Sequence, residues 1–139
     1  MVSFHQGCNI LTFVQGLTRV GGLKAGETLV VSGAAGAVGA VTCQLGKHMG
    51  AKVYAIAGTK DKCDWLEQEC GVEKAFNYKS PTFREDFKKT VKYFDVYFDN
   101  VGGDILDFML TRLNKNARVV MCGKNMLAYH MAEVLSQVL

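Results

Sequence analysis

The segment from Thr28 to Ala40 reads TLVVSGAAGAVGA, in which an apolar run passes directly into a turn rich in glycine and alanine. Ala34, Gly36 and Gly39 have the spacing of the G-x-G-x-x-G fingerprint, with alanine at its first position. In that pattern the first residue keeps the turn tight, the second lets the backbone approach a pyrophosphate, and the third lets the helix pack on its strand. The N–H groups at the start of the helix would face the pyrophosphate. The segment therefore predicts a dinucleotide site, and a purely structural turn is the alternative.

Apolar runs and amphipathic segments alternate along the rest of the chain. The expected strands are 28–32, 52–57, 74–77, 95–99 and 117–122, and the expected helices are 10–20, 37–49, 60–69, 104–113 and one that begins at Ser80 and Pro81. The first strand-helix-strand unit is about 30 residues long, as that motif requires. Because crossovers between parallel strands are right-handed, this order predicts an α/β fold with a Rossmann-like, doubly wound parallel sheet. The length of 139 residues fits a single domain.

Helical spacing of the apolar residues predicts which faces of the helices are buried. Thr59 is expected to cap the helix over 60–69, and Gly71 to end it in a left-handed conformation. The residues expected to point inward are Val38, Val41, Leu45 and Met49 or their neighbours; Trp65 and Leu66; Phe83, Phe87 and Val91; and Ile105, Leu106, Met109, Leu110 and Leu113.

The alternation of strands and helices stops after Gly123. Apolar residues spaced between Met126 and Val138 suggest an amphipathic helix rather than a sixth strand. We therefore expect residues 1–123 to form the nucleotide-binding domain with its leading helix, and residues 124–139 to form a divergent amphipathic tail.

Composition argues against several classes of partner. The net charge of +3 comes from lysines scattered along the chain, so we expect no nucleic-acid partner and no membrane-surface partner. No stretch reaches the ~18 consecutive apolar residues of a membrane span, and the first residues do not resemble a signal peptide. The expected location is therefore the cytoplasm.

The thiols and imidazoles show no metal-ligand spacing. An odd number of cysteines without a C-x-x-C pair indicates neither a zinc cluster nor a disulfide framework. We expect buried or idle thiols, and histidines that lie at the surface or at helix ends. These residues are Cys8, Cys43, Cys63, Cys70 and Cys122, and His5, His48 and His130.

The end of the second expected strand predicts which dinucleotide is preferred. An NAD-specific site places an acidic residue about 20 residues after the glycines, where it holds the ribose 2′-hydroxyl. Here that place is occupied by the sequence 57–59, AGT, and Lys60 and Lys62 follow at the start of a helix. Without a carboxylate to repel it, a 2′-phosphate would be accepted. NADP(H) is therefore expected rather than NAD(H), and the alternative is that both lysines are simply solvated.

Four strings together carry a resemblance to one family. They are AAGAVG at 34–39, FNYK at 76–79, YFDNVGG at 97–103 and MCG at 121–123. With these strings the chain resembles the nucleotide-binding domain of the zinc-independent medium-chain dehydrogenase/reductases. Within that superfamily it is most similar to the leukotriene B4 dehydrogenase/prostaglandin reductase group and its fungal and bacterial NADP-dependent relatives. The resemblance covers about residues 11–123, with the strings in order and at near-family spacing.

The resemblance implies a set of residues that contact NADP(H). Lys62 and Tyr78 would contact the adenosine-side ribose and its 2′-phosphate, while Asn100 would lie near the nicotinamide half. Taken alone, Tyr78 also fits a strand-end aromatic, and Asn100 fits a turn residue. The residues expected at the cofactor are Gly36, Ala37, Val38, Gly39, Gly58, Lys62, Tyr78, Asn100, Cys122 and Gly123.

The activity that the resemblance implies is reduction of the C=C bond of an α,β-unsaturated ketone or aldehyde. NADPH would deliver hydride to the β-carbon, and a hydroxyl or water would protonate the α-carbon while the pocket stabilises the enolate. The resemblance implies no metal. Tyr129, one position away from the family's tyrosine, is the candidate catalytic residue in this chain.

Chains of that family are more than twice this long, because a catalytic domain precedes the nucleotide-binding fold. We expect this truncated chain to lack that domain, and therefore to expose apolar surface that a second copy or a partner protein covers. Three hypotheses stay open. The chain belongs to an NADP-dependent enone reductase, or is a non-catalytic NADPH-binding or interaction module, or uses the fold for cofactor-independent chemistry through residues such as Tyr97, Tyr129 or His130.

Overall fold

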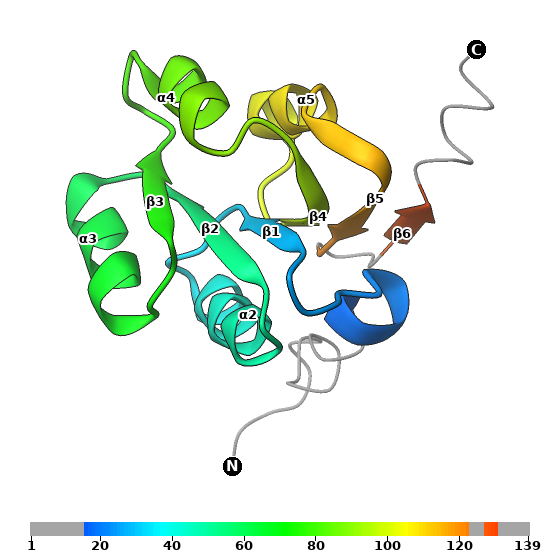
Figure 1. The fold of residues 1–139 in the computed structure, drawn as a ribbon. Helices are drawn as coiled ribbons and strands as arrows, with labels where there is room; N and C mark the ends of the chain where they lie inside the picture. The colour runs from blue at the N-terminus through cyan, green and yellow to red at the C-terminus, as the bar shows by residue number, and fades with distance from the viewer. Residues whose placement is uncertain (1–15, 123–126, 131–139) are drawn as a thin grey trace.

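The computed structural model describes residues 16–122 and the backbone of residues 127–130. From residue 16 to residue 121, strands and helices alternate in the predicted order (Figure 1). The strands are β1 (Thr28–Val31), β2 (Lys52–Ala57), β3 (Lys74–Asn77), β4 (Phe94–Asp99), β5 (Leu113–Met121) and β6 (Leu127–His130). The helices are η1 (Gly16–Val20, a short π-helix), α2 (Ala37–His48), α3 (Lys60–Glu69), α4 (Phe83–Thr90) and α5 (Gly103–Leu110).

The strands form one sheet in the order β3-β2-β1-β4-β5-β6. The first five of these strands pair in parallel, and β6 pairs antiparallel with β5. The expected α/β fold with a doubly wound parallel sheet is therefore confirmed. Because the chain leaves β1 toward β2 on one side and returns to β4 on the other, the ends of β1 and β4 form the switch point where such folds bind ligands.

Two hydrophobic clusters pack on opposite faces of the sheet, as its two layers of helices show (Figure 1). On one face, Cys43 of α2 and Leu66 of α3 pack with the sheet. On the other face, Phe87 of α4 and Phe108 of α5 stack edge to face, with their ring centroids 5.8 Å apart. Thr59 caps α3 by accepting a hydrogen bond from the N–H of Lys62 at 3.3 Å, as predicted.

The predicted inward faces are confirmed in part. Phe83 and Phe87 are buried as expected, but Trp65 is 43% exposed and Val41 and Leu110 are also exposed. In α2 the neighbours of the predicted residues are buried instead, and in α5 Phe108 is buried although it was not among the predicted residues. In α2 the buried face includes Gly46, where a Cβ would meet the side chains of Leu29 and Val53, so the helix lies close to the sheet.

Three expected element boundaries are wrong. Helix α4 begins at Phe83 rather than at Pro81, because the carbonyl oxygen of Ser80 accepts the N–H of Phe83 in a preceding turn. Helix α5 ends at Leu110, and β5 already begins at Leu113.

The expected tail helix is also wrong for residues 127–130, which form β6. Their backbone pairs with the outer edge of β5, whose N–H and C=O groups require partners. The rest of the expected tail helix, and the expected helix 10–20 up to residue 15, lie outside the described residues. The division into a domain and a tail at residue 123 stays a prediction.

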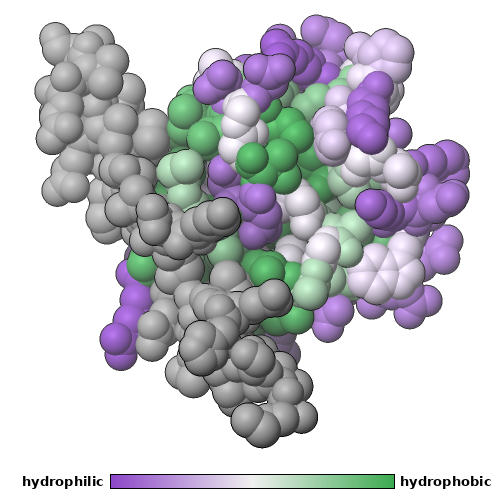
Figure 2. All heavy atoms as spheres, turned by 180° about the vertical axis from the view of Figure 1, so that it is seen from behind, coloured by the Kyte–Doolittle hydropathy of each residue, from purple (hydrophilic) through white to green (hydrophobic). Residues whose placement is uncertain are grey.

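The surface seen from behind carries both polar and apolar groups (Figure 2). Hydrophilic side chains rim the described part of that face, and hydrophobic atoms lie between them. The large apolar residues most exposed on the whole described surface are Val41, Trp65, Tyr78, Tyr93, Val101 and Leu110. Among the described residues no helix has the length and apolar character to cross a membrane.

Candidate functional site

The glycine-rich turn connects the end of β1 with the start of α2. Gly33 adopts a left-handed conformation with φ of 57°, and its carbonyl accepts the N–H of Gly36 at 3.1 Å. A Cβ on Gly39 would lie 2.4 Å from the carbonyl oxygen of Gly33 and 2.5 Å from the Cα of Ala34. The close packing predicted for Gly39 is therefore present, since any side chain there would push the helix away from its turn.

Gly36 is the N-cap of α2, and no side chain caps this helix. A Cβ on Gly36 would meet only the carbonyl oxygen of Gly33, at 3.4 Å. The first turn of α2 therefore presents backbone N–H groups and the positive end of the helix dipole at an uncrowded position. Such a helix end favours an anionic ligand.

Two adjoining pockets open at this end of the sheet. The first, which we call the glycine pocket, has a volume of about 290 Å³. The second, which we call the lysine pocket, has a volume of about 330 Å³. The glycine pocket is lined by Gly33, Gly36, Ala37, Val38, Gly39, Asn100 and Cys122, and the lysine pocket by Gly33, Ala35, Gly36, Ala57, Gly58, Thr59, Lys62, Tyr78, Lys79 and Val101. The two pockets share Gly33 and Gly36, so together they make one continuous site along the ends of β1, β2 and β4.

Every described residue that the sequence predicts at the cofactor lines one of these two pockets. Gly123 lies outside the described residues, and Tyr129 lies in β6, where only the backbone is described. The structure thus brings together residues that lie up to 86 positions apart in the sequence, from Gly36 to Cys122. Their contact with a cofactor stays a prediction.

The lysine pocket combines a tyrosine ring with two cations. A Cβ on Gly58 would come within 3.1 Å of the Tyr78 ring, so the glycine allows the ring to lie against the end of β2. The Nζ of Lys79 lies 5.8 Å from the centre of the same ring, within the range of a cation–π contact. No acidic residue lines this pocket.

Lys79 is a pocket residue that the sequence reasoning missed as a contact. The signal was its place directly after Tyr78 in the string FNYK, but a lysine after a strand is usually solvated. Only the return of the chain from β3 places it on the same pocket as Lys62.

Asn100 borders the glycine pocket and is tied to β1. Its Nδ2 donates a hydrogen bond to the carbonyl oxygen of Ser32 at 2.8 Å. Its backbone N–H donates to the hydroxyl of Ser32 at 3.0 Å. Asn100 therefore is a turn residue, as its sequence context suggested, and it also lines the pocket.

Tyr97 does not fit the role that one hypothesis gave it. Its side chain is fully buried in the sheet, and its hydroxyl donates to Asp99 at 2.9 Å. Burial, together with the neighbouring Asp99 carboxylate, raises the pKa of Tyr97. A tyrosine without solvent access cannot contact a substrate, so this expectation is wrong. The side chains of Tyr129 and His130 lie outside the described residues.

Three of the described cysteines, Cys43, Cys63 and Cys70, are free thiols and are buried as expected. Burial, with a smaller contribution from Cys70, raises the pKa of Cys43 from 9.0 to about 12. Burial also raises the pKa of Cys63. Cys122 is partly exposed and lines the glycine pocket. Among the described residues no three His, Cys, Asp or Glu side chains gather to hold a metal.

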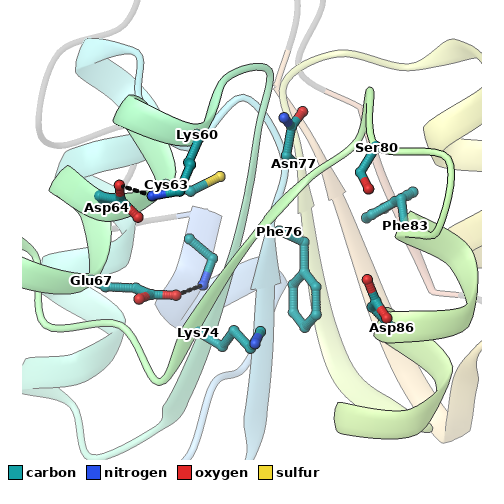
Figure 3. A pocket seen from close by; sticks show the side chains of 11 residues that line it. Lys60, Cys63, Asp64, Glu67, Lys74, Phe76, Asn77, Ser80, Phe83 and Asp86 are labelled. Carbon is teal, nitrogen blue, oxygen red and sulfur yellow. Dashed lines mark hydrogen bonds and ion pairs between the residues drawn. The ribbon is translucent and has the colours of Figure 1, made fainter.

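A larger pocket of about 500 Å³ lies beside β3, between α3 and α4 (Figure 3). Its polar groups are engaged with one another, because Lys60 pairs with Asp64 at 2.7 Å and Glu67 accepts the backbone N–H of Ala75 at 2.9 Å (Figure 3). Glu67 thereby covers an N–H on the outer edge of the sheet. None of the residues expected at the cofactor lines this pocket, so size alone does not identify the site.

Comparison with known proteins identifies the family of the chain. The sequence profile of the zinc-binding dehydrogenase family matches residues 37–137, which is most of the chain. The chain belongs to this family. The resemblance to medium-chain dehydrogenase/reductases is thereby confirmed, and the match includes α2, whose start forms the glycine pocket.

Two of the curated relatives carry the name of a reductase. Over 115 residues the chain is 41% identical to prostaglandin reductase 1 of Bos taurus, and the match covers 81% of this chain and 35% of that protein. Over 113 residues it is 39% identical to the NADPH-dependent curcumin reductase of Escherichia coli (strain K12), covering 81% of this chain and 33% of that protein. The chain thus spans about a third of the length of the curated relatives it matches.

The fold is also that of a solved relative. The crystal structure of CurA from Vibrio vulnificus in complex with NADPH superposes with a TM-score of 0.81 and 32% sequence identity. The match covers 95% of this chain and 42% of that one.

Proposed function

We propose that this chain is the NADP(H)-binding part of an oxidoreductase that reduces the C=C bond of α,β-unsaturated ketones or aldehydes. The observation that carries the proposal is the continuous site formed by the glycine and lysine pockets at the switch point of the sheet. The NADP-dependent relatives and the NADPH complex of CurA support the choice of cofactor.

The residues present fit such a cofactor. The uncapped start of α2 suits the pyrophosphate, because its backbone N–H groups are open and Gly36 leaves room for close approach. Lys62 and Lys79 suit the 2′-phosphate, since both line a pocket that contains no acidic residue. Asn100 and Cys122, which also line the glycine pocket, would lie near the nicotinamide half.

When bound, the cofactor supplies hydride to the β-carbon of the enone. The chain's own residues bind and orient it: Tyr78 and the lysines hold the adenosine side, and the glycine turn holds the pyrophosphate. Hydride transfer also needs a substrate held about 3–3.5 Å from the reacting carbon. We expect the walls that hold it to come largely from outside residues 16–122.

The exposed apolar residues suggest what supplies those walls. Trp65, Tyr93 and Leu110 are each more than a third exposed. We expect a second copy of the chain or a partner protein to cover part of this surface. Sedimentation of the purified chain would show association if a second copy covers this surface. A monomer at every concentration would contradict self-association.

The lysine pocket gives the sharpest test of the cofactor. Calorimetric titration with NADPH should show that Lys62→Ala weakens binding by about tenfold or more, because a charge-assisted contact to the 2′-phosphate is lost. Lys60→Ala is the matched control. Lys60 lies in the same helical turn, but it pairs with Asp64 and lines the larger pocket beside β3. Equal losses in both variants would contradict a specific 2′-phosphate contact.

Activity tests the second half of the proposal. Loss of the 340-nm absorbance of NADPH in the presence of an enone would support reduction by this chain. Tight NADPH binding without turnover, even with added partner, would favour a non-catalytic NADPH-binding module instead.

A further inference from the structure

A buried polar network lies directly behind Asn100. Asp99, at the end of β4, is only 3% exposed, and Ser32, at the end of β1, is fully buried. The Oδ1 of Asp99 accepts hydrogen bonds from the hydroxyl of Ser32 at 3.0 Å, from the hydroxyl of Tyr97 at 2.9 Å and from the backbone N–H of Gly102 at 3.1 Å. A carboxylate this deeply buried is retained only where such donors surround it.

This network determines how the Ser32 hydroxyl is oriented. A serine hydroxyl has one proton to donate, and Asp99 can only accept when ionised. The proton of Ser32 therefore points to Asp99, which leaves the lone pairs of the oxygen for the backbone N–H of Asn100 at 3.0 Å. Asp99 thus acts on Asn100 through Ser32.

The orientation of the Asn100 side chain follows from the same residue. The carbonyl oxygen of Ser32 can only accept a hydrogen bond, so the Asn100 group that faces it at 2.8 Å is the Nδ2 donor. The amide oxygen of Asn100 makes no hydrogen bond with any of the described residues. Asn100 lines the glycine pocket, and its oxygen is therefore an acceptor left for a ligand there.

We propose that Ser32 and Asp99 are positioning residues that fix the amide of Asn100 as an acceptor for the carboxamide N–H of the nicotinamide. This inference rests on the proposed function. It adds two buried residues that act on the nicotinamide half of the site, whereas Lys62 and Tyr78 border the adjoining lysine pocket.

The test compares two probes of the full chain by calorimetry. NADPH carries the nicotinamide, whereas adenosine 2′,5′-bisphosphate carries only the adenosine half with its 2′-phosphate. Ser32→Ala should weaken NADPH binding by about fivefold, as expected for the loss of a hydrogen bond, and change the bisphosphate affinity less than twofold. A general loss of structure would weaken both probes together, so the ratio of the two affinities isolates the positioning role.

Two further variants make the comparison sharper. Asn100→Ala should lower the same ratio at least as much as Ser32→Ala does. Tyr97→Phe is the matched control, because it removes another buried donor to the same oxygen of Asp99 without a contact to Asn100. It should leave the ratio unchanged.

The possible outcomes separate the two proposals. If a folded Ser32→Ala variant keeps the wild-type ratio, or if Tyr97→Phe lowers it equally, the positioning role is wrong while the proposed function stands. If Ser32→Ala does not fold, the nearly isosteric Ser32→Cys variant is measured in its place, with the same expected ratio. If the wild-type chain binds neither probe, the proposed function fails and this inference fails with it.

Discussion

At the scale of single residues, Gly36 and Gly39 of the fingerprint have different roles in the structure. Gly39 is required for folding, because its missing side chain is what allows α2 to lie on the turn. Gly36 is tolerant of a methyl group on steric grounds, since its φ of −73° is accessible to alanine and the nearest atom would be 3.4 Å away. Folding and binding can therefore be separated at these positions.

We predict that Gly39→Ala mainly lowers stability, whereas Gly36→Ala mainly weakens NADPH binding. Gly39→Ala should lower the free energy of unfolding by about 1–3 kcal/mol, because the methyl group overlaps backbone atoms. Gly36→Ala should cost less than about 1 kcal/mol, the difference between glycine and alanine at an N-cap, but weaken NADPH binding at least tenfold by filling the pocket. Urea unfolding and calorimetry measure both quantities. A Gly36→Ala variant that binds NADPH normally would exclude close approach of the pyrophosphate.

A second residue-scale prediction concerns stability in alkali. The pKa of Cys43 is raised in the folded chain, so the unfolded chain loses this proton first as the pH rises above 9.0. The contribution of the Cys43 thiol to the free energy of unfolding is fully present below pH 9. It falls by up to about 1.4 kcal/mol per pH unit between pH 9 and about 12. The raised pKa of Tyr97 acts in the same direction at higher pH.

Urea unfolding at pH 8 and pH 10 measures this effect. The free energy of unfolding should fall between the two values, and it should fall less in Cys43→Ala. An identical pH dependence in both chains would show that the Cys43 thiol is not protected from ionisation.

The residue scale also shows a limit of sequence patterns. Trp65 was predicted to point inward together with Leu66, yet the buried residues of α3 and its C-cap are Cys63, Leu66 and Cys70, at spacings of three and four residues. At 100° per residue, Trp65 lies about 100° from Leu66, the nearest residue of that stripe, and farther from the other two. These two adjacent residues therefore do not share one buried face, and Leu66 is the one that packs inward.

At the scale of elements, strand runs were predicted well and their boundaries less so. Strands β2 and β3 have the expected limits, because their apolar residues end at glycine and asparagine turns. The edge strand β6 was missed, since a four-residue strand is specified by the free edge of β5 rather than by its own pattern. Long-range backbone partners of this kind leave no local signal.

Arg118 links two parts of the fold through hydrogen bonds and an ion pair, and the strength of this link can be tested. Its guanidinium donates to the carbonyl oxygens of Gly21 and Gly22 at 2.6 and 3.0 Å and pairs with Glu27 at 2.6 Å, which joins β5 to the segment before β1. The two charged side chains are only 17% and 22% exposed. Arg118→Ala should therefore lower the free energy of unfolding by about 2–4 kcal/mol, since Glu27 and two carbonyls lose their partner.

An exposed ion pair serves as the control for Arg118. Lys88 and Glu85 lie 4.0 Å apart on α4 and are both largely exposed. Lys88→Ala should leave the urea midpoint almost unchanged. A comparable shift in both variants would contradict the structural role given to Arg118.

At the scale of the whole molecule, the site is a product of topology. The sequence could predict the glycine turn and, through family resemblance, Tyr78 and Asn100, because both follow strands within recognisable strings. Lys62 was predicted from the resemblance and from its place shortly after Gly58 at the start of a helix. It could not predict that Lys79 borders the same pocket, or that Ser32 and Asp99 meet behind Asn100. Those contacts exist only because β1 lies between β2 and β4 in the sheet.

The central claim is that these strand ends bind NADP(H) in preference to NAD(H). The most direct measurement is calorimetric titration of the unmodified chain with NADPH and, separately, with NADH. The account predicts micromolar binding of NADPH and at least tenfold weaker binding of NADH, because only NADPH carries the 2′-phosphate that two lysines can neutralise. Equal affinity for the two, or no binding of either to a folded chain, would contradict it.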